Sequence, residues 1–154
     1  MGFSFDGISS KSMGIASRMA TENRVPELKN RTISMAGRDG LIDLGASLSE
    51  RVIEISCFIP PKLTAAELLR CKDEIVSWLS PDKGVCELKL DTEPGRVYYA
   101  RLQNGVTFER VVRLAATFDL AFFCPDPFGY AVEDEVFNIT TAGTPTVRRR
   151  LGKL

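Results

Sequence analysis

The residues best suited to acid–base chemistry are two groups of carboxylates. Asp39 and Asp43 flank a turn, and Glu133, Asp134 and Glu135 follow one another directly. A carboxylate pair can do general acid–base work, and an acidic cluster can hold a hard cation. However, we interpret Asp39 as a turn residue and Asp43 as a solvent-facing one, and three consecutive carboxylates on an extended chain cannot converge on one ion. We therefore expect no catalytic carboxylate pair and no metal.

The candidate nucleophiles are four cysteines in a chain that has no histidine. The lack of histidine excludes Ser-His-Asp triads, Cys-His dyads and histidine-ligated zinc or haem. Cys57, Cys71, Cys86 and Cys124 form no Cys-x-x-Cys pair. A reactive thiol needs both a nearby cation and exposure, and nothing in the sequence singles out one of the four. We interpret them as small core residues, and expect that the protein is not an enzyme and binds no cofactor.

Three further motifs could recognise a phosphate, a sugar or a nucleic acid. The GRDG segment at 37–40 lacks the Lys-Ser/Thr ending of a phosphate loop and opens no helix. Tyr98 or Tyr99 could form a stacking platform, but adjacent strand residues point to opposite faces, so only one can join a given surface. Arg148–Arg150 is interpreted as a solvated tail. Because 20 basic and 20 acidic residues cancel, no broad basic field is available for nucleic acid.

The elements that must position these residues are predicted mainly as strands. The 154 residues are 44% hydrophobic and 26% charged, which is typical of a globular domain. No stretch approaches the roughly 20 apolar residues of a membrane span, and we expect no membrane insertion. Apolar residues at every second position over 51–59, 85–91 and 116–124 predict three half-buried strands.

Turn signals separate the predicted strands. They are Asp39-Gly40, Glu93-Pro94-Gly95 and Asn104-Gly105. The first predicts a hairpin, the second a type II turn with a positive φ at Gly95, and the third a type I′ hairpin between the strands on either side. Their close spacing indicates antiparallel sheets.

One amphipathic helix, over about 64–79, interrupts the strands. Thr64 and Glu67 have the spacing of a capping box, and Pro81 follows the helix as a stop signal. Apolar residues share one stripe at helical spacing, namely Leu68, Cys71, Ile75, Trp78 and Leu79. The stripe should pack on a sheet. The chain is therefore predicted to be mainly β (α+β), an antiparallel β-sandwich with one amphipathic helix.

Two strand segments are apolar on both faces. The segment VYYARL at 97–102 directs large side chains to both sides, and the same holds around Phe123. Such a strand is either central in a layered fold or covered by another subunit. Tyr98, Tyr99 and Phe123 are therefore candidate interface or stacking aromatics.

Five motifs occur in a characteristic order. They are FSFDGISSKSMGI at the start, GRDG at 37–40, the alternating strand before a capped helix that ends in SWL at 77–79, PGRVYYARL at 94–102, and FDLAFFCPDPFGY at 118–130, which contains Asp126-Pro127-Phe128. Together they span most of the chain. In this order and spacing the chain resembles the N-terminal domain of the distal tail proteins of long, non-contractile-tailed phages and prophages, the siphovirus tail-component family.

The resemblance implies a structural virion protein, made and assembled in the bacterial host cytoplasm and located at the distal end of the tail. Six copies would form a ring whose channel lets DNA pass without specific binding. The implied partners are copies of the chain itself, the tail-tube protein, and tail-tip hub or receptor-binding proteins. The resemblance also implies an extended β-hairpin that clasps the neighbouring subunit. The candidate arm residues are Ile33, Met35, Gly37, Arg38, Asp39, Gly40, Leu41 and Leu44.

The same resemblance divides the chain into two parts. Residues 1–130 are expected to be the ring-forming domain. Residues 131–154 are expected to be a C-terminal arm or the start of a galectin-like second domain, for which the chain is too short. The alternative hypothesis is a small β-sandwich module that binds carbohydrate or protein without ring assembly.

Overall fold

The computed structural model describes residues 2–20 and 26–133. Arg148–Arg150 and most of the acidic run at 133–135 therefore lie outside the described residues. Within the described ranges the elements are β1 (Phe3–Phe5), β2 (Ile8–Ser9), β3 (Ala16–Met19), β4 (Leu28–Ile33), β5 (Ile42–Leu48), β6 (Arg51–Ile59), α1 (Ala65–Trp78), a 3₁₀ turn (Pro81–Lys83), β7 (Cys86–Leu90), β8 (Arg96–Leu102), β9 (Glu109–Val112), β10 (Ala115–Cys124) and β11 (Tyr130–Ala131).

The body is one antiparallel sheet that folds over on itself. Its strand order is β2-β1-β7-β8-β10-β6-β3, with β11 added on β8 and β9 added on β10. Strand β8 joins the two halves, because it pairs with β7 over most of its length and with β10 only at Leu102–Phe122 and Arg101–Phe123. The halves face each other, since the Phe5 and Phe122 rings are 5.1 Å apart. The predicted antiparallel β-sandwich is confirmed.

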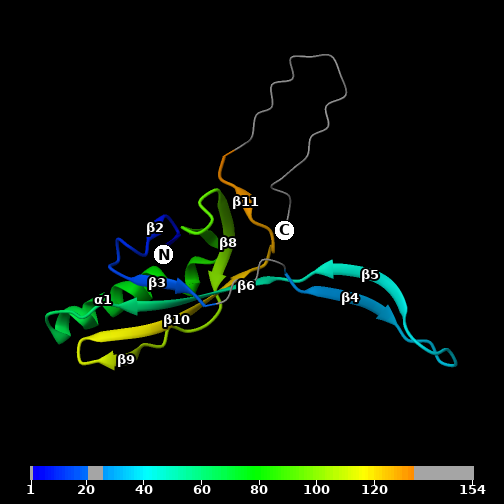
Figure 1. The fold of residues 1–154 in the computed structure, drawn as a ribbon, viewed down its shortest axis with the longest axis horizontal. Coiled ribbons are helices and arrows are strands. Elements are labelled where there is room, and N and C mark those ends of the chain that lie inside the picture. Colours follow the sequence, from blue (N-terminus) through cyan, green and yellow to red (C-terminus); the bar gives the residue numbers. More distant parts are fainter. Residues whose placement is uncertain (1, 21–25, 134–154) are drawn as a thin grey trace, which may run out of the picture.

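The helix closes the core between the two halves of the sheet (Figure 1). All five residues of the apolar stripe are buried, and the capping box is formed, with the Thr64 hydroxyl accepting from the Glu67 amide at 3.2 Å. At the other end, the Trp78 indole stacks on Phe3 at 5.6 Å and its Nε1 donates to the Phe5 carbonyl at 2.9 Å. The helix thus holds strand β1 in place.

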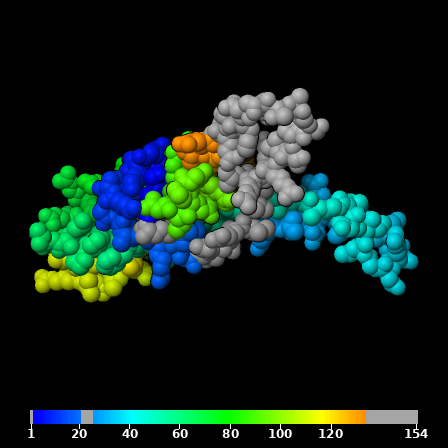
Figure 2. Space-filling view, turned by 45° about the horizontal axis from the view of Figure 1, so that its top comes forward, coloured from blue at the N-terminus to red at the C-terminus, as the bar shows by residue number. Residues whose placement is uncertain are grey.

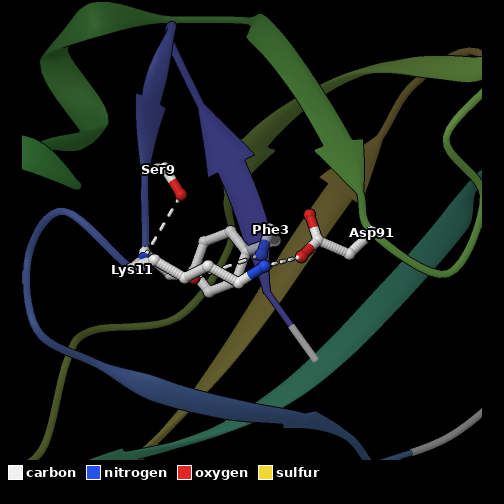
Figure 3. Close-up of polar contacts among 5 residues, drawn as sticks. Phe3, Ser9, Lys11 and Asp91 are labelled. Atoms are coloured by element: carbon white, nitrogen blue, oxygen red, sulfur yellow. Dashed lines mark hydrogen bonds and ion pairs between the residues drawn. The ribbon is translucent and has the colours of Figure 1, made fainter.

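An N-terminal hairpin, β1–β2, turns at Asp6-Gly7 with positive φ at both residues, 52° and 77°. The Asp-Gly pair is itself a hairpin signal in the sequence. Figure 3 shows how the hairpin is fixed to the end of β7: the Lys11 ammonium lies 2.6 Å from the Asp91 carboxylate, and the Lys11 amide donates to the Ser9 hydroxyl. Gly2 passes so close to Asp91 that a Cβ there would lie 2.7 Å from Oδ2.

Two of the predicted turns are wrong in detail. The strands flanking Asn104-Gly105 do not pair with each other: β8 and β9 both pair with β10, and Gly105 lacks a positive φ. The reason lies in the Asn104 side chain, which donates to the Asp119 carbonyl and accepts from the Ala121 amide, taking the place of a paired strand on β10. At 93–95 a turn closes, with the Arg96 amide on the Glu93 carbonyl at 3.0 Å. Gly95 has no positive φ there, so this turn is not type II.

Candidate assembly surfaces

The most unusual feature of the fold is the β4–β5 hairpin, which projects from the body as an arm (Figures 1 and 2). It forms a separate two-stranded sheet. Every described residue of β4 is exposed, as is every residue of β5 except Ile42, which is half-buried. The predicted extended hairpin is confirmed, and its strands are longer than the 33–44 segment singled out in the sequence.

Large apolar side chains follow the whole arm without entering the core. Those exposed by more than a third of their surface are Leu28, Ile33, Met35, Leu41, Leu44 and Leu48, with Leu41 the most exposed at 66%. A two-stranded hairpin alone is at best marginally stable in water, and a contiguous exposed apolar patch marks an interaction surface. Among the described residues, the arm therefore finds no contacts that would bury its apolar side chains.

The strand register places these apolar residues on both faces of the arm. Leu28 pairs with Leu48 near the body, and Ile33 pairs with Ile42 near the tip. Because side chains alternate along a strand, Leu28 and Ile33 point to opposite faces, and Leu44 shares the face of Ile42. One face is thus apolar near the body and the other near the tip.

A β-bulge separates the two apolar regions. Between the pairs Asn30–Ala46 and Thr32–Asp43, β4 contributes one residue and β5 contributes two. Gly45 takes the positive φ of 97° that this geometry needs, and its amide donates to the Asp43 carboxylate at 2.8 Å. Asp43 therefore supports the bulge of the arm and is not part of a carboxylate pair.

The tip of the arm is a glycine turn. Gly37 and Gly40 have φ of 81° and 86°, values that favour glycine, and the Arg38 amide donates to the Met35 carbonyl. Arg38 and Asp39 are exposed at the tip. The GRDG motif therefore serves as the turn that lets two strands form an arm.

Polar contacts fix the arm where it leaves the body. The Ser49 amide donates to the Glu27 carbonyl at 2.7 Å, and the Lys29 ammonium lies 3.1 Å from the Glu50 carboxylate. The hydrogen bond from the Ser49 hydroxyl, together with the Lys29 charge, lowers the pKa of Glu50 to about 2. The carboxylate is exposed, so it orients the start of the arm and adds little stability.

A buried polar network lies where the chain passes from the arm into β6. Arg51, only 5% exposed, donates from Nη1 to the Tyr98 hydroxyl at 3.2 Å, and that hydroxyl donates to the Glu93 carboxylate at 2.5 Å. Burial and the Glu93 hydrogen bond raise the pKa of Tyr98, so the phenol stays protonated. The network ties the first residue of β6, directly after the arm, to the start of β8.

The candidate aromatics divide between core and surface. Tyr98 is 1% exposed, so its assignment as an interface or stacking residue is wrong: its ring fills the core beside Arg51. Tyr99 points the other way, is 40% exposed, and packs edge-to-face on Tyr130 at 5.8 Å. Phe123 is half-buried, with the Arg101 guanidinium 4.9 Å from its ring. Tyr130 and Arg101 are additions to this surface that periodicity alone did not single out.

The Asp126-Pro127-Phe128 motif shapes the chain between β10 and β11. The Asp126 carboxylate accepts from the Phe128 amide at 3.1 Å and from the Tyr130 hydroxyl. The next residue, Gly129, touches the Tyr98 ring, where a Cβ would lie 2.9 Å from a ring carbon. These contacts set the position of β11 on β8.

Three of the four cysteine thiols lie in the core. Burial raises the pKa of the Cys57 and Cys124 thiols to about 12, and Cys71 is also buried. Residues 2–20 and 26–133 contain no cluster of three or more metal-ligating side chains. Among the same residues, no helix has the length and hydrophobicity needed to cross a bilayer.

Comparison with known proteins identifies the family. The family model of the phage tail protein RIFT-related domain matches residues 8–124. The chain belongs to this family. The match runs from β2 to the end of β10, so it includes α1 and the arm of this tail domain. It confirms the resemblance seen in the ordered motifs.

A solved structure has the same fold. The Dit protein (gp 19.1) of SPP1, described as a paradigm of the hub adsorption apparatus of phages that infect Gram-positive bacteria, matches with a TM-score of 0.69 at 22% sequence identity. The alignment covers 84% of this chain and 51% of Dit, so the tail domain spans about half the length of that protein. None of the curated proteins matches the chain.

Proposed function

We propose that the tail domain is a distal tail hub: copies of it, six in number, form a ring that joins the tail tube to the tail-tip and host-adsorption apparatus, around a channel for DNA. Family membership supports a role in the tail, and the fold shared with Dit supports the hub position. The observation that carries self-assembly is the arm, whose apolar residues remain exposed in the single chain.

In this proposal the arm clasps the neighbouring subunit. A projecting element that binds elsewhere on an identical copy makes a head-to-tail contact, and such contacts close into rings when the rotation allows. The tip residues Met35 and Leu41, with Ile33 and Leu44 behind them, supply the apolar contact. Residues 1–130 are assigned to the ring domain, and residues 131–154 to a C-terminal arm or the start of a second domain. The role is structural and requires no catalysis.

The state of assembly tests the proposal. Six copies of a 17.0-kDa chain give 6 × 17.0 = 102 kDa, which static light scattering resolves from a monomer. A matched variant replaces residues 28–48 with a short Gly-Ser linker, which fits because the Glu27 carbonyl and the Ser49 amide already lie 2.7 Å apart. We expect the full chain to assemble and the armless chain to remain a folded monomer. A full chain that is monomeric at the highest concentration reached would contradict the proposal.

A second candidate function is a binding module that does not assemble. The observation favouring it is the exposed pair Tyr99 and Tyr130, since tyrosines combine a large apolar surface with a polar tip. Their edge-to-face packing, at an interplanar angle of 64°, presents no flat two-ring platform. Glycan-array binding by a monomer, lost in Tyr99→Ala, would support this function over the ring.

A further inference from the structure

We propose that the arm of one copy docks on strand β9 of the next, with the outer edge of β5 extending the neighbour's sheet. This inference rests on the proposed function, because it names the surface that receives the arm. It combines two features that have no partner strand among the described residues: the outer edge of β5 beyond its bulge, and the outer edge of an exposed strand on the body.

The two edges of the arm differ in how they are protected. Natural edge strands are usually guarded by cationic side chains, proline or a bulge. Strand β4 carries Lys29 and Arg31, whereas β5 (Ile42–Leu48) has no lysine, arginine or proline. Its one charged residue is Asp43, which is engaged in the bulge. Apart from that bulge, the backbone edge of β5 is open to another strand.

On the body, β9 is the edge strand with the most exposed apolar surface. Among the described residues it pairs with β10 alone, and all four of its residues are exposed. Val111 is 57% and Val112 is 54% exposed. The other body edges fit less well, because β2 and β11 have two residues each, and β3 exposes Ala16 and Arg18 but no large apolar side chain.

The surroundings of β9 complement β5 in charge and in polarity. Arg110 and Arg113 are exposed on and beside β9, and Lys72 of α1 lies nearby, its ammonium 5.2 Å from the Phe108 ring. Leu63, 89% exposed, adjoins the β9–β10 turn, since the preceding residue donates its amide to the Leu114 carbonyl. The exposed Glu109 of β9 is acidic, but it is outnumbered by these three cations. An apolar surface with a net positive charge thus meets a strand that is apolar and carries only an acidic charge.

The positions of the two features make the contact intermolecular. Strand β9 and the arm lie toward opposite ends of the molecule's longest axis (Figure 1), and the space-filling view shows the same separation (Figure 2). One chain therefore cannot pair its own β5 with its own β9. Pairing between copies gives the repeated head-to-tail contact that a ring needs, and adds strands to the short two-stranded arm.

Disulfide cross-linking between the two strands tests the docking surface. In a Cys86→Ser background, in which the remaining cysteines are buried, Val111→Cys is combined in turn with Ala46→Cys, Ser47→Cys and Leu48→Cys. We expect oxidation to give ladders in multiples of 17.0 kDa. The yield should alternate along the three positions, because neighbouring strand residues point to opposite faces.

The control replaces Val111→Cys with Val76→Cys, a valine of α1 with a similar exposure of 50%. Ladders from the Val76→Cys control as strong as those from Val111→Cys would overturn pairing along β9. Cross-linking yields that do not alternate along 46–48 would overturn it too. If light scattering shows an oligomer but none of the three Val111→Cys combinations cross-links, the proposed ring stands and this docking surface is refuted. If the full chain is monomeric, the proposed function and the docking surface fail together.

Discussion

The double variant Leu41→Ser, Leu44→Ser separates the role of the arm in assembly from any role in folding. These side chains are 66% and 56% exposed in the single chain. Substitutions at exposed positions usually change the free energy of unfolding by less than about 0.5 kcal/mol. We therefore expect the monomer's unfolding midpoint in urea to stay close to that of the wild type.

The same two substitutions should weaken the association between copies strongly. Full burial of a leucine side chain contributes about 1.5–3 kcal/mol, and more than half of each side chain is still available for burial on docking. Each substitution should therefore remove about 1–2 kcal/mol per contact. Since about 1.4 kcal/mol is a factor of ten, the two together should weaken each contact roughly 30- to 700-fold.

The assay is sedimentation velocity over a concentration series, with urea unfolding of the same samples. The matched control is Val76→Ser with Val85→Ser, two exposed valines of the body at 50% and 49% exposure. We expect the control to assemble as the wild type does, and the arm variant to shift to monomer. An arm variant that assembles normally, or that unfolds as easily as a core variant, would refute the argument.

Three further predictions concern the body. Thr64→Ala removes the helix cap and should lower the free energy of unfolding by about 0.5–2 kcal/mol, measured in urea. Tyr98→Phe removes the hydroxyl that bridges the buried Arg51 to the start of β8, and should cost about 1–3 kcal/mol by the same measurement. Cys57 and Cys124, whose pKa burial raises to about 12, should not react with an aromatic disulfide reagent at mildly alkaline pH until the chain is unfolded.

Each of these predictions has its own control. Thr64→Ser keeps the capping hydroxyl and should retain the wild-type stability, whereas an equal loss in both variants would mean that the cap contributes nothing. Tyr99→Phe alters an exposed hydroxyl on the same strand, so a loss as large as that of Tyr98→Phe would contradict the buried network. The half-buried Cys86 should react first among the thiols. Immediate reaction of all four would contradict the core packing.

Local patterns in the sequence were sufficient for the core. The alternation over 51–59 and 116–124 and the helical stripe over 64–79 are confirmed because each element packs one face on the same core, so its period reports its burial. Tyr98 was harder to place, since alternation separates it from Tyr99 without showing which side is the core. Only the folded-over sheet decides that Tyr98 lies inside.

Long-range pairing is what the sequence did not reveal. Asn104-Gly105 has the composition of a tight hairpin, but the Asn104 amide finds its partners on β10, so the strands beside it pair elsewhere. In the arm, local alternation suggests burial that the fold does not provide. The sequence of β5 alternates like that of a core strand, and nothing local shows that its apolar residues have no core to enter.

Electron microscopy of the assembled chain shows whether this tail domain builds a ring. Two-dimensional class averages should show six-fold rings with an open centre, and the armless variant should show none. Classes containing only single copies of the 17.0-kDa chain, or open filaments without closed rings, would contradict the proposed ring.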